Sequence, residues 1–409
     1  MKPLQAIGRR RFLQTAGMVT VAVAGGGVWR AYNQGVFSRG EGQAYEPWNN
    51  WKGEKLEGPL ALVPAAILAA NPHNSQPWLF QVEETSINLF ADGKRNLGAI
   101  DPFLREMHIG LGCALENLSL ASQARGYKCQ LTLEPKGADP SHVARIDLSP
   151  APPLRSELYD AIPERHTHRG PYDPTRPLSP DVFSALESLR EPTSEVEVQW
   201  FHSAADRARL GALLVDATKA IIEDEAQAEV SFGWYRHGWD EIQRYRDGLT
   251  IDTFGMPAPI RLIAKMLPRP SRKTFDSGWL QTTRDVQVAT AGAFGILTAS
   301  DWRERRLRLQ VGRLWQRMHL WATANGIAMQ PLSQLTERAD REASLGIPSK
   351  FGEALKQLLE RPNQEVLMLF RLGYPARPAY ASPRRAVEDV LVLQRPVARD
   401  QRPVLDTKN

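Results

Sequence analysis

Residues 69–78 read Ala69-Ala70-Asn71-Pro72-His73-Asn74-Ser75-Gln76-Pro77-Trp78, and they separate two kinds of pattern. The apolar run before them, 60–68, predicts a helix, and the alternating residues after them, 79–82 and 87–90, predict two strands. Prolines and short polar residues between such elements are typical of a helix end and a turn. The same residues offer amide side chains and backbone N–H groups to a planar polar ligand. An ordinary connecting loop is the alternative.

The composition is that of a globular protein, with 42% hydrophobic and 24% charged residues. A chain of 409 residues is long enough for one large domain or two. The net charge is +5, and residues 1–30 contain five basic residues and no acid. Since the remainder is neutral overall, the basic isoelectric point does not indicate a nucleic-acid-binding surface.

The N-terminus contains a candidate export signal. Gly8-Arg9-Arg10-Arg11-Phe12-Leu13-Gln14 resembles the twin-arginine pattern, and a short apolar stretch follows at 15–28. We interpret 1–30 as a signal read by the twin-arginine export machinery, or as an uncleaved membrane anchor. Either would place the protein in the periplasm or at the outer face of the inner membrane. A basic tail without this role is the alternative.

Breaks in the pattern divide the rest of the chain. We predict an arm or linker at 31–57, a first half at 58–153, a second half at 154–395 and a tail at 396–409. A helix is expected at 107–124 and strands at 130–133 and 144–148. In the second half we expect helices at 179–189, 204–229, 302–325 and 349–360, strands at 196–201, 286–298 and 365–372, and a loop at 329–334.

One helical segment in each half suggests that the halves are related. Residues 112–126 and 312–326 are offset by 200, share Gly, Leu and Ala in register, and both begin and end with Gly. Chance similarity between two amphipathic helices is the alternative.

Two further features leave alternatives open. The aromatic segment 230–280 is either a lid over a site or a simple surface excursion. Cys113 and Cys129 form either a disulfide or two free thiols, and no metal-ligand spacing accompanies them.

Arg165-His166-Thr167-His168-Arg169 is the most concentrated basic element of the second half. In an extended conformation the side chains of Arg165, Thr167 and Arg169 point the same way. Two guanidinium groups and a hydroxyl on one side suit a phosphate. An exposed basic loop is the alternative.

Four stretches, in this order and spacing, resemble the flavin-binding elements of the nitroreductase superfamily, and most closely its single-chain Acg-type branch. They are 71–78, 165–169, 328–333 and 373–385. The resemblance implies an α+β fold in which two related halves are fused as a pseudo-dimer, with mixed or antiparallel sheets flanked by helices. It also implies FMN as the cofactor. Asn71, Pro72 and His73 stand where the wider family has small hydroxyl residues, which fits the Acg-type branch.

The resemblance also implies roles for individual residues. No catalytic side chain and no metal are expected. Because only the second half has the Arg-rich element and only the first has Asn-x-Gln-Pro-Trp, one FMN site per chain is expected. The implied ligands are Arg165, Thr167 and Arg169 for the ribityl chain and phosphate, Arg384 or Arg385 for the phosphate, Asn74 and Gln76 for the isoalloxazine edge, and Pro331, Leu332 and Ser333 near flavin N5.

The leading functional hypothesis is an FMN-dependent oxidoreductase. It would pass electrons from NAD(P)H or another donor to a small electron-poor acceptor, such as a nitro compound or a quinone. A non-catalytic FMN-binding or sequestering protein is the first alternative. An exported interaction protein without flavin is the second.

Overall fold

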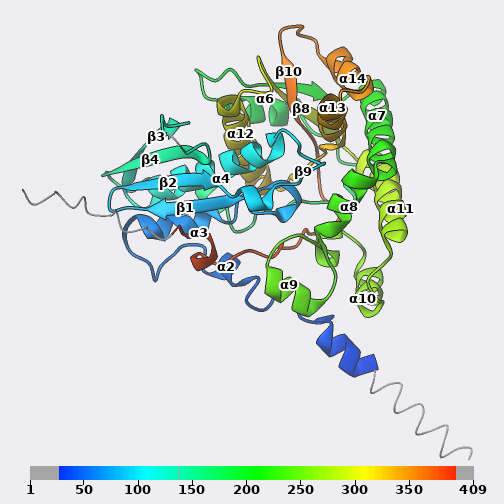
Figure 1. Ribbon diagram of the computed structural model, residues 1–409, viewed down its shortest axis with the longest axis horizontal. Coiled ribbons are helices and arrows are strands. Elements are labelled where there is room, and N and C mark those ends of the chain that lie inside the picture. The colour runs from blue at the N-terminus through cyan, green and yellow to red at the C-terminus, as the bar shows by residue number, and fades with distance from the viewer. Residues whose placement is uncertain (1–26, 138, 393–409) are drawn as a thin grey trace, which may run out of the picture.

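The computed structural model describes residues 27–137 and 139–392 (Figure 1). Most of the predicted twin-arginine segment and the tail at 396–409 therefore lie outside the described residues. Within 27–137 and 139–392, no helix is both long and apolar enough to cross a bilayer.

The first half contains a four-stranded antiparallel sheet with strand order β1-β2-β4-β3. Short helical turns at 58–66 precede it, as the apolar run predicted. The long helix α4 connects β2 to β3 and packs beside the sheet (Figure 1). The elements are β1 (Trp78–Val82), β2 (Ser86–Ala91), α4 (Arg105–Ala124), β3 (Tyr127–Leu133) and β4 (His142–Pro150).

The second half contains another antiparallel sheet, with strand order β5-β8-β10-β9. Taken in chain order, its strands pair in the same pattern as those of the first half, and a long helix again joins the second strand to the third. The elements are β5 (Glu197–Phe201), β8 (Ala293–Ala299), α12 (Arg305–Ala324), β9 (Ala328–Pro331) and β10 (Glu365–Gly373). The predicted α+β class with two similar halves is confirmed.

The two long helices meet at a pair of glycines. A Cβ atom on Gly312 would lie 2.0 Å from the Ile109 carbonyl oxygen, and one on Gly112 would lie 2.2 Å from that of Leu309. The Cys113 thiol donates to the Gly312 carbonyl at 3.3 Å. One hydrophobic core runs through both sheets and both helices. Gly112 and Gly312, which are 200 residues apart in the sequence, thus lie where α4 and α12 cross.

The remaining helices of the second half cover its sheet and one side of the molecule (Figure 1). The segment 230–280 is mostly helical and includes two short paired strands, β6 (Tyr235–Arg236) and β7 (Leu249–Thr250). The helices are α5 (Glu157–Asp160), α6 (Pro180–Ser188), α7 (Ala204–Glu223), α8 (Glu225–Gly233), α9 (Trp239–Tyr245), α10 (Ala258–Met266), α11 (Arg272–Thr282), α13 (Gln334–Leu345) and α14 (Lys350–Leu358).

Three sequence predictions were wrong in detail. The expected helix at 204–229 is two helices, because Asp224 leaves the helical conformation and caps α8 by accepting from the Gln227 amide. Residues 283–288 form a π-helical turn, so the strand expected from 286 begins at 293. The expected loop at 329–334 is strand β9 followed by α13, which the pattern had not revealed.

The N-terminal arm and the cysteines are also defined. Trp48 in α2 (Glu46–Asn49) and Trp51 are buried in the main core, so 31–57 wraps onto the body. Cys113 is buried, Cys129 is half-buried, and both are free thiols.

Candidate functional site

A cavity of 460 Å³ lies between the two halves. The first half supplies the loop at 70–73 and one face of α4, and the second half supplies Arg169 and the stretch 330–337. Segment 230–280 forms a further wall with mostly apolar residues, including Tyr235, Phe254, Phe275 and Trp279. A cavity of this size, largely apolar with a few polar groups, can hold a flat ring system.

A much smaller cavity adjoins the large one and is strongly basic. Arg165, Arg169 and Arg384 all line it, together with Thr167 and Ser382. No ion pair connects the three guanidinium groups to any carboxylate within the described residues. Burial lowers the pKa of Arg165 and of Arg169 to about 10, so both remain charged at neutral pH. The cavity therefore concentrates positive charge that no carboxylate of the described part of the chain neutralises.

The three arginines differ in how many hydrogen bonds they donate to protein groups. Arg384 donates to carbonyl groups of the 68–69 segment and to Asn74. Arg165 donates to the Leu68 carbonyl at 3.0 Å, but its Nε atom and that of Arg384 are buried with no hydrogen-bond partner in the part of the chain that the structure describes. Arg169 makes no hydrogen bond to the described residues. Donor capacity thus remains available for an anion.

The backbone of the loop at 69–78 is held in a strained conformation. His73, Asn74 and Gln76 all have positive φ angles, between 48° and 56°. The Asn71 carboxamide oxygen accepts from the Gln76 amide at 2.8 Å, and Gln316 of α12 accepts from the Ala70 amide at 3.2 Å. Such strain persists where surrounding contacts enforce it, and it is common at functional sites. Here it brings Asn71 to the walls of both cavities.

Two of the predicted flavin ligands lie elsewhere. Gln76 is fully buried away from both cavities, where its side chain bonds the Arg385 amide and the Arg246 carbonyl, each at 2.8 Å. Arg385 is also outside both cavities and lies 3.7 Å from the Asp92 carboxylate. The expected phosphate contact of Arg385 and ring contact of Gln76 do not fit this geometry.

Asn74 fits the predicted ring contact no better. It lines the small basic cavity and not the large one. Its amide group donates to the Pro383 carbonyl at 2.8 Å, and its oxygen accepts from Arg384. Asn74 therefore orients Arg384, and it has no free group for the edge of a ring.

Pro331, Leu332 and Ser333 do line the large cavity, at the start of α13. The Leu332 amide donates to the Leu369 carbonyl at 2.9 Å, and the Ser333 carbonyl accepts from the Glu337 amide at 2.8 Å, so these two backbone groups are already used. Thr167 lines both cavities. Eight of the ten predicted residues thus line a cavity, and only Gln76 and Arg385 do not: the eight are Asn74, Arg165, Thr167, Arg169, Pro331, Leu332, Ser333 and Arg384.

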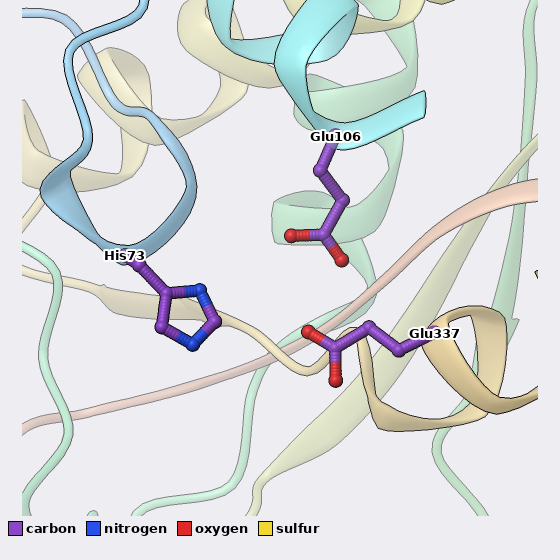
Figure 2. A group of neighbouring side chains, drawn as sticks. All are labelled: His73, Glu106 and Glu337. Carbon is purple, nitrogen blue, oxygen red and sulfur yellow. The ribbon is translucent and has the colours of Figure 1, made fainter. Parts of the chain in front are cut away.

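A group of side chains in the large cavity was not predicted. His73, Glu106 of α4 and Glu337 of α13 come from distant parts of the chain, and their polar atoms lie within 4.8 Å of one another. Figure 2 shows the two carboxyl groups facing each other, with the imidazole beside them. Such a set has the spacing for a divalent cation, but a proton shared between the carboxyl groups also accounts for the pair. No sequence motif relates the three residues, so their proximity could not be predicted from the sequence pattern.

Burial controls the protonation of this group. It raises the pKa of Glu337 to about 8, although the hydrogen bond with Glu106 opposes this rise. Burial and the neighbouring Glu337 carboxyl together raise the pKa of Glu106 well above its usual range. Burial and the charge of Arg169 lower the pKa of His73 to about 4. Near neutral pH the imidazole is therefore uncharged, and the carboxyl pair holds at least one proton.

This arrangement predicts a pH dependence of stability. Between about pH 4.5 and pH 8 the folded protein keeps a proton on Glu337 that the unfolded chain releases, so raising the pH favours unfolding. We expect the melting temperature of ligand-free protein to fall from pH 6 to pH 9, and to fall less in Glu337→Gln. Differential scanning calorimetry measures this, with exposed Glu229 as the control in Glu229→Gln. Parallel curves for Glu337→Gln and the wild type would contradict the assignment.

Comparison with known proteins finds relatives that are similar to this chain over most of its length. No family model matches it. A Mycobacterium tuberculosis protein provisionally named as an NAD(P)H nitroreductase is 28% identical over 333 residues, or 80% of this chain and 88% of the relative. A second, named Acg, is 26% identical over 341 residues, covering 80% and 93%. An uncharacterised protein of the same organism is 23% identical over 338 residues, covering 80% and 91%. The similarity spans nearly the whole of each relative.

Solved structures give a weaker likeness. The FMN-dependent nitroreductase NfnB from Mycobacterium smegmatis, in complex with NADPH, has a TM-score of 0.37 and 20% identity, covering 58% of this chain and 98% of that one. A Bacteroides fragilis nitroreductase with bound FMN has a TM-score of 0.33 and 14% identity, covering 59% and 100%. At these scores the likeness adds nothing to the strand order and packing described above.

Proposed function

We propose that the protein is an FMN-dependent oxidoreductase of the nitroreductase type. The observation that carries this proposal is the small basic cavity, where three guanidinium groups adjoin a larger apolar cavity and have no carboxylate partner among residues 27–137 and 139–392. A phosphate joined to a flat ring system by a short polar chain matches this pair of cavities. The names of two relatives at 28% and 26% identity support the same activity.

The residues present fit FMN. Arg165, Arg169 and Arg384 would hold the phosphate, and each charge-assisted contact contributes roughly 1.5–3 kcal/mol when sheltered. Thr167, which borders both cavities, would meet the ribityl chain. When bound, FMN supplies the redox centre.

The chain itself would position the reactants around that centre. The mostly apolar wall formed by segment 230–280 would offer few hydrogen-bond partners to water in the large cavity, and Asn71 and Ser333 are polar residues of its lining. The Glu106–Glu337 pair can hold a proton at the carboxyl oxygens inside the large cavity. NAD(P)H is the proposed donor, because the names of the relatives specify it. The acceptor is proposed to be a small electron-poor compound.

We further propose that the two halves form a fused pseudo-dimer with one FMN site. The repeated strand order and the 200-residue offset of the crossing helices support this arrangement. The loop at 69–78 comes from the first half, and the basic residues come from the second. The sequence of the first half contains no Arg-rich element like that at 165–169, and the sequence of the second half contains no Asn-x-Gln-Pro-Trp loop.

The test is the visible spectrum of freshly purified protein, with acid release and quantification of the chromophore. We expect a flavin spectrum and about one FMN per chain. We also expect riboflavin, which lacks the phosphate, to bind at least roughly 100-fold more weakly, since two or more charge-assisted contacts are lost. A stoichiometry near two would contradict the single site. A colourless protein that does not bind added FMN would overturn the proposal and favour an interaction protein.

The cover formed by 230–280 favours a second candidate, a protein that binds FMN and does not turn over. Donor and acceptor both need access to the flavin face, and a closed wall would restrict it. Anaerobic titration with NADPH separates the candidates, because bleaching of the flavin absorbance occurs only in the enzyme.

Export remains a proposal supported by the sequence of 8–28, which lies almost entirely outside the described residues. A folded, cofactor-loaded cargo suits the twin-arginine route. Fractionation of cells that express the full chain decides whether it reaches the periplasmic side.

A further inference from the structure

Helix α10 buries charged residues and exposes apolar ones, which is the opposite of an ordinary surface helix. Its charged residues Arg261 and Lys265 are buried and pair with Asp252 at 3.3 Å and 2.6 Å. Its apolar residues face outward, since Ile260 is 54% and Ile263 is 62% exposed. Placing isoleucine in water and charge inside is costly unless something covers the apolar face.

The N-terminal arm extends this apolar surface. Residues 27–33 are helical and lie at the same end of the molecule as α10 (Figure 1). The Arg30 guanidinium donates to the Met266 carbonyl at 2.7 Å, which ties the arm to the end of α10. Trp29, Tyr32 and Phe37 are 68%, 80% and 76% exposed. Two segments that are far apart in the sequence thus expose large apolar side chains at the same end of the molecule.

Exposed basic residues without an ion pair lie near these side chains. Arg30, Arg39 and Lys273 are exposed and form no ion pair within the described residues. The other basic residues of 253–275 are paired, Arg261 and Lys265 with Asp252, Arg269 with Glu241 and Arg272 with Glu225. Exposed tryptophan, tyrosine and arginine beside isoleucine are the composition of an interfacial membrane surface. Basic residues close to such a surface attract anionic lipid headgroups.

We propose that α10 and residues 27–40 together form a docking face that inserts shallowly into the surface of an anionic lipid bilayer. The apolar stretch at 15–28 continues in the sequence into residues 27–40 of this face. If that stretch binds a membrane, it would bring the arm and α10 to the same membrane. The docking face is distinct from the stretch at 15–28, because it needs no helix to cross the bilayer.

The docking face also borders the large cavity. Ala264 of α10, Leu267 and Pro268 are part of the cavity wall, and Leu267 is 55% exposed. Docking would place this wall against lipid, so a lipid-soluble acceptor would reach the cavity from the membrane. This consequence rests on the proposed function, whereas the docking itself does not.

The experiment places a fluorescent reporter on the docking face of the full chain. Ile263→Cys and, as the matched control, Ile347→Cys are labelled with nitrobenzoxadiazole in a Cys129→Ser background. Ile347 is 44% exposed and lies between α13 and α14, away from α10. On adding phosphatidylcholine vesicles that contain phosphatidylglycerol, we expect a blue shift at position 263 and none at 347. Vesicle flotation should be roughly tenfold weaker for Ile263→Glu and unchanged for Ile347→Glu.

Three results would overturn the docking face. If the protein floats with vesicles but position 263 does not shift, the segment before residue 27 alone binds lipid. If the shift appears without vesicles and grows with protein concentration, a second copy of the chain covers the face. If neither flotation nor a shift occurs, the face does not bind lipid. The flavin spectrum is independent of all three, so failure of the docking face and failure of the proposed function are distinguishable.

Discussion

Replacing Gly312 with alanine is expected to lower the melting temperature by about 5 °C or more. The new Cβ would lie 2.0 Å from the Ile109 carbonyl oxygen and 2.9 Å from the Gly112 Cα atom, so α4 and α12 would have to separate. Both contacts are with backbone, which cannot rotate away as a side chain can. Overpacking of this kind costs at least about 3 kcal/mol, and the cavity between the halves would lose its shape. Calorimetry on the ligand-free protein measures the effect.

The matched control is Gly278→Ala in α11. No atom lies within 4 Å of a Cβ at that position, so the added methyl meets open space. Alanine is the better helix former, and the variant should be as stable as the wild type or up to about 1 kcal/mol more stable. Equal melting temperatures for the two variants would mean that the crossing of α4 and α12 is not tightly packed.

Replacing Arg169 with methionine is expected to weaken FMN binding by roughly 10- to 150-fold, the equivalent of one sheltered charge-assisted contact. Arg169 lines the small basic cavity and makes no hydrogen bond to the described residues, so its removal should leave the fold intact. It also removes one of three like charges. The ligand-free variant should therefore melt at the same temperature as the wild type or slightly higher. Fluorescence titration with FMN gives the affinity.

Two comparisons make this result specific to the phosphate. Riboflavin affinity should change little in Arg169→Met, because riboflavin presents no phosphate to the basic cavity. Arg385→Met is the matched arginine control, since Arg385 lies beside Asp92 and outside both cavities, and its FMN affinity should stay within about twofold of the wild type. An equal loss for riboflavin and FMN would show that Arg169 shapes the site and does not bind the phosphate.

The sequence predicted most of the architecture because its strongest patterns are local. Helical periodicity located α4 and α12, and alternation located β1 and β2. The five-residue element at 165–169 predicted which side chains share a face, because extended backbone fixes that direction without any tertiary contact. Arg165, Thr167 and Arg169 accordingly line one small cavity.

What the sequence did not predict depends on contacts between distant segments. Arg384 and Arg385 are neighbours in the chain, and only the packing of Asn74 and Asp92 decides that the first faces the cavity and the second does not. Glu106 and Glu337 meet because α4 and α13 converge, and α13 itself was missed. The Gln76 side chain was predicted to contact the flavin ring, because no local pattern shows that its oxygen accepts from the Arg385 amide.

The crossing of α4 and α12 has a consequence for how the cavity responds to dilution. Subunits of a two-chain assembly separate when their concentration falls below the dissociation constant, and a site shared between them is then lost. Here both walls of the cavity belong to one polypeptide, so each half meets the other at an effective concentration that the connecting chain sets. One molecule alone is enough to keep the cavity assembled.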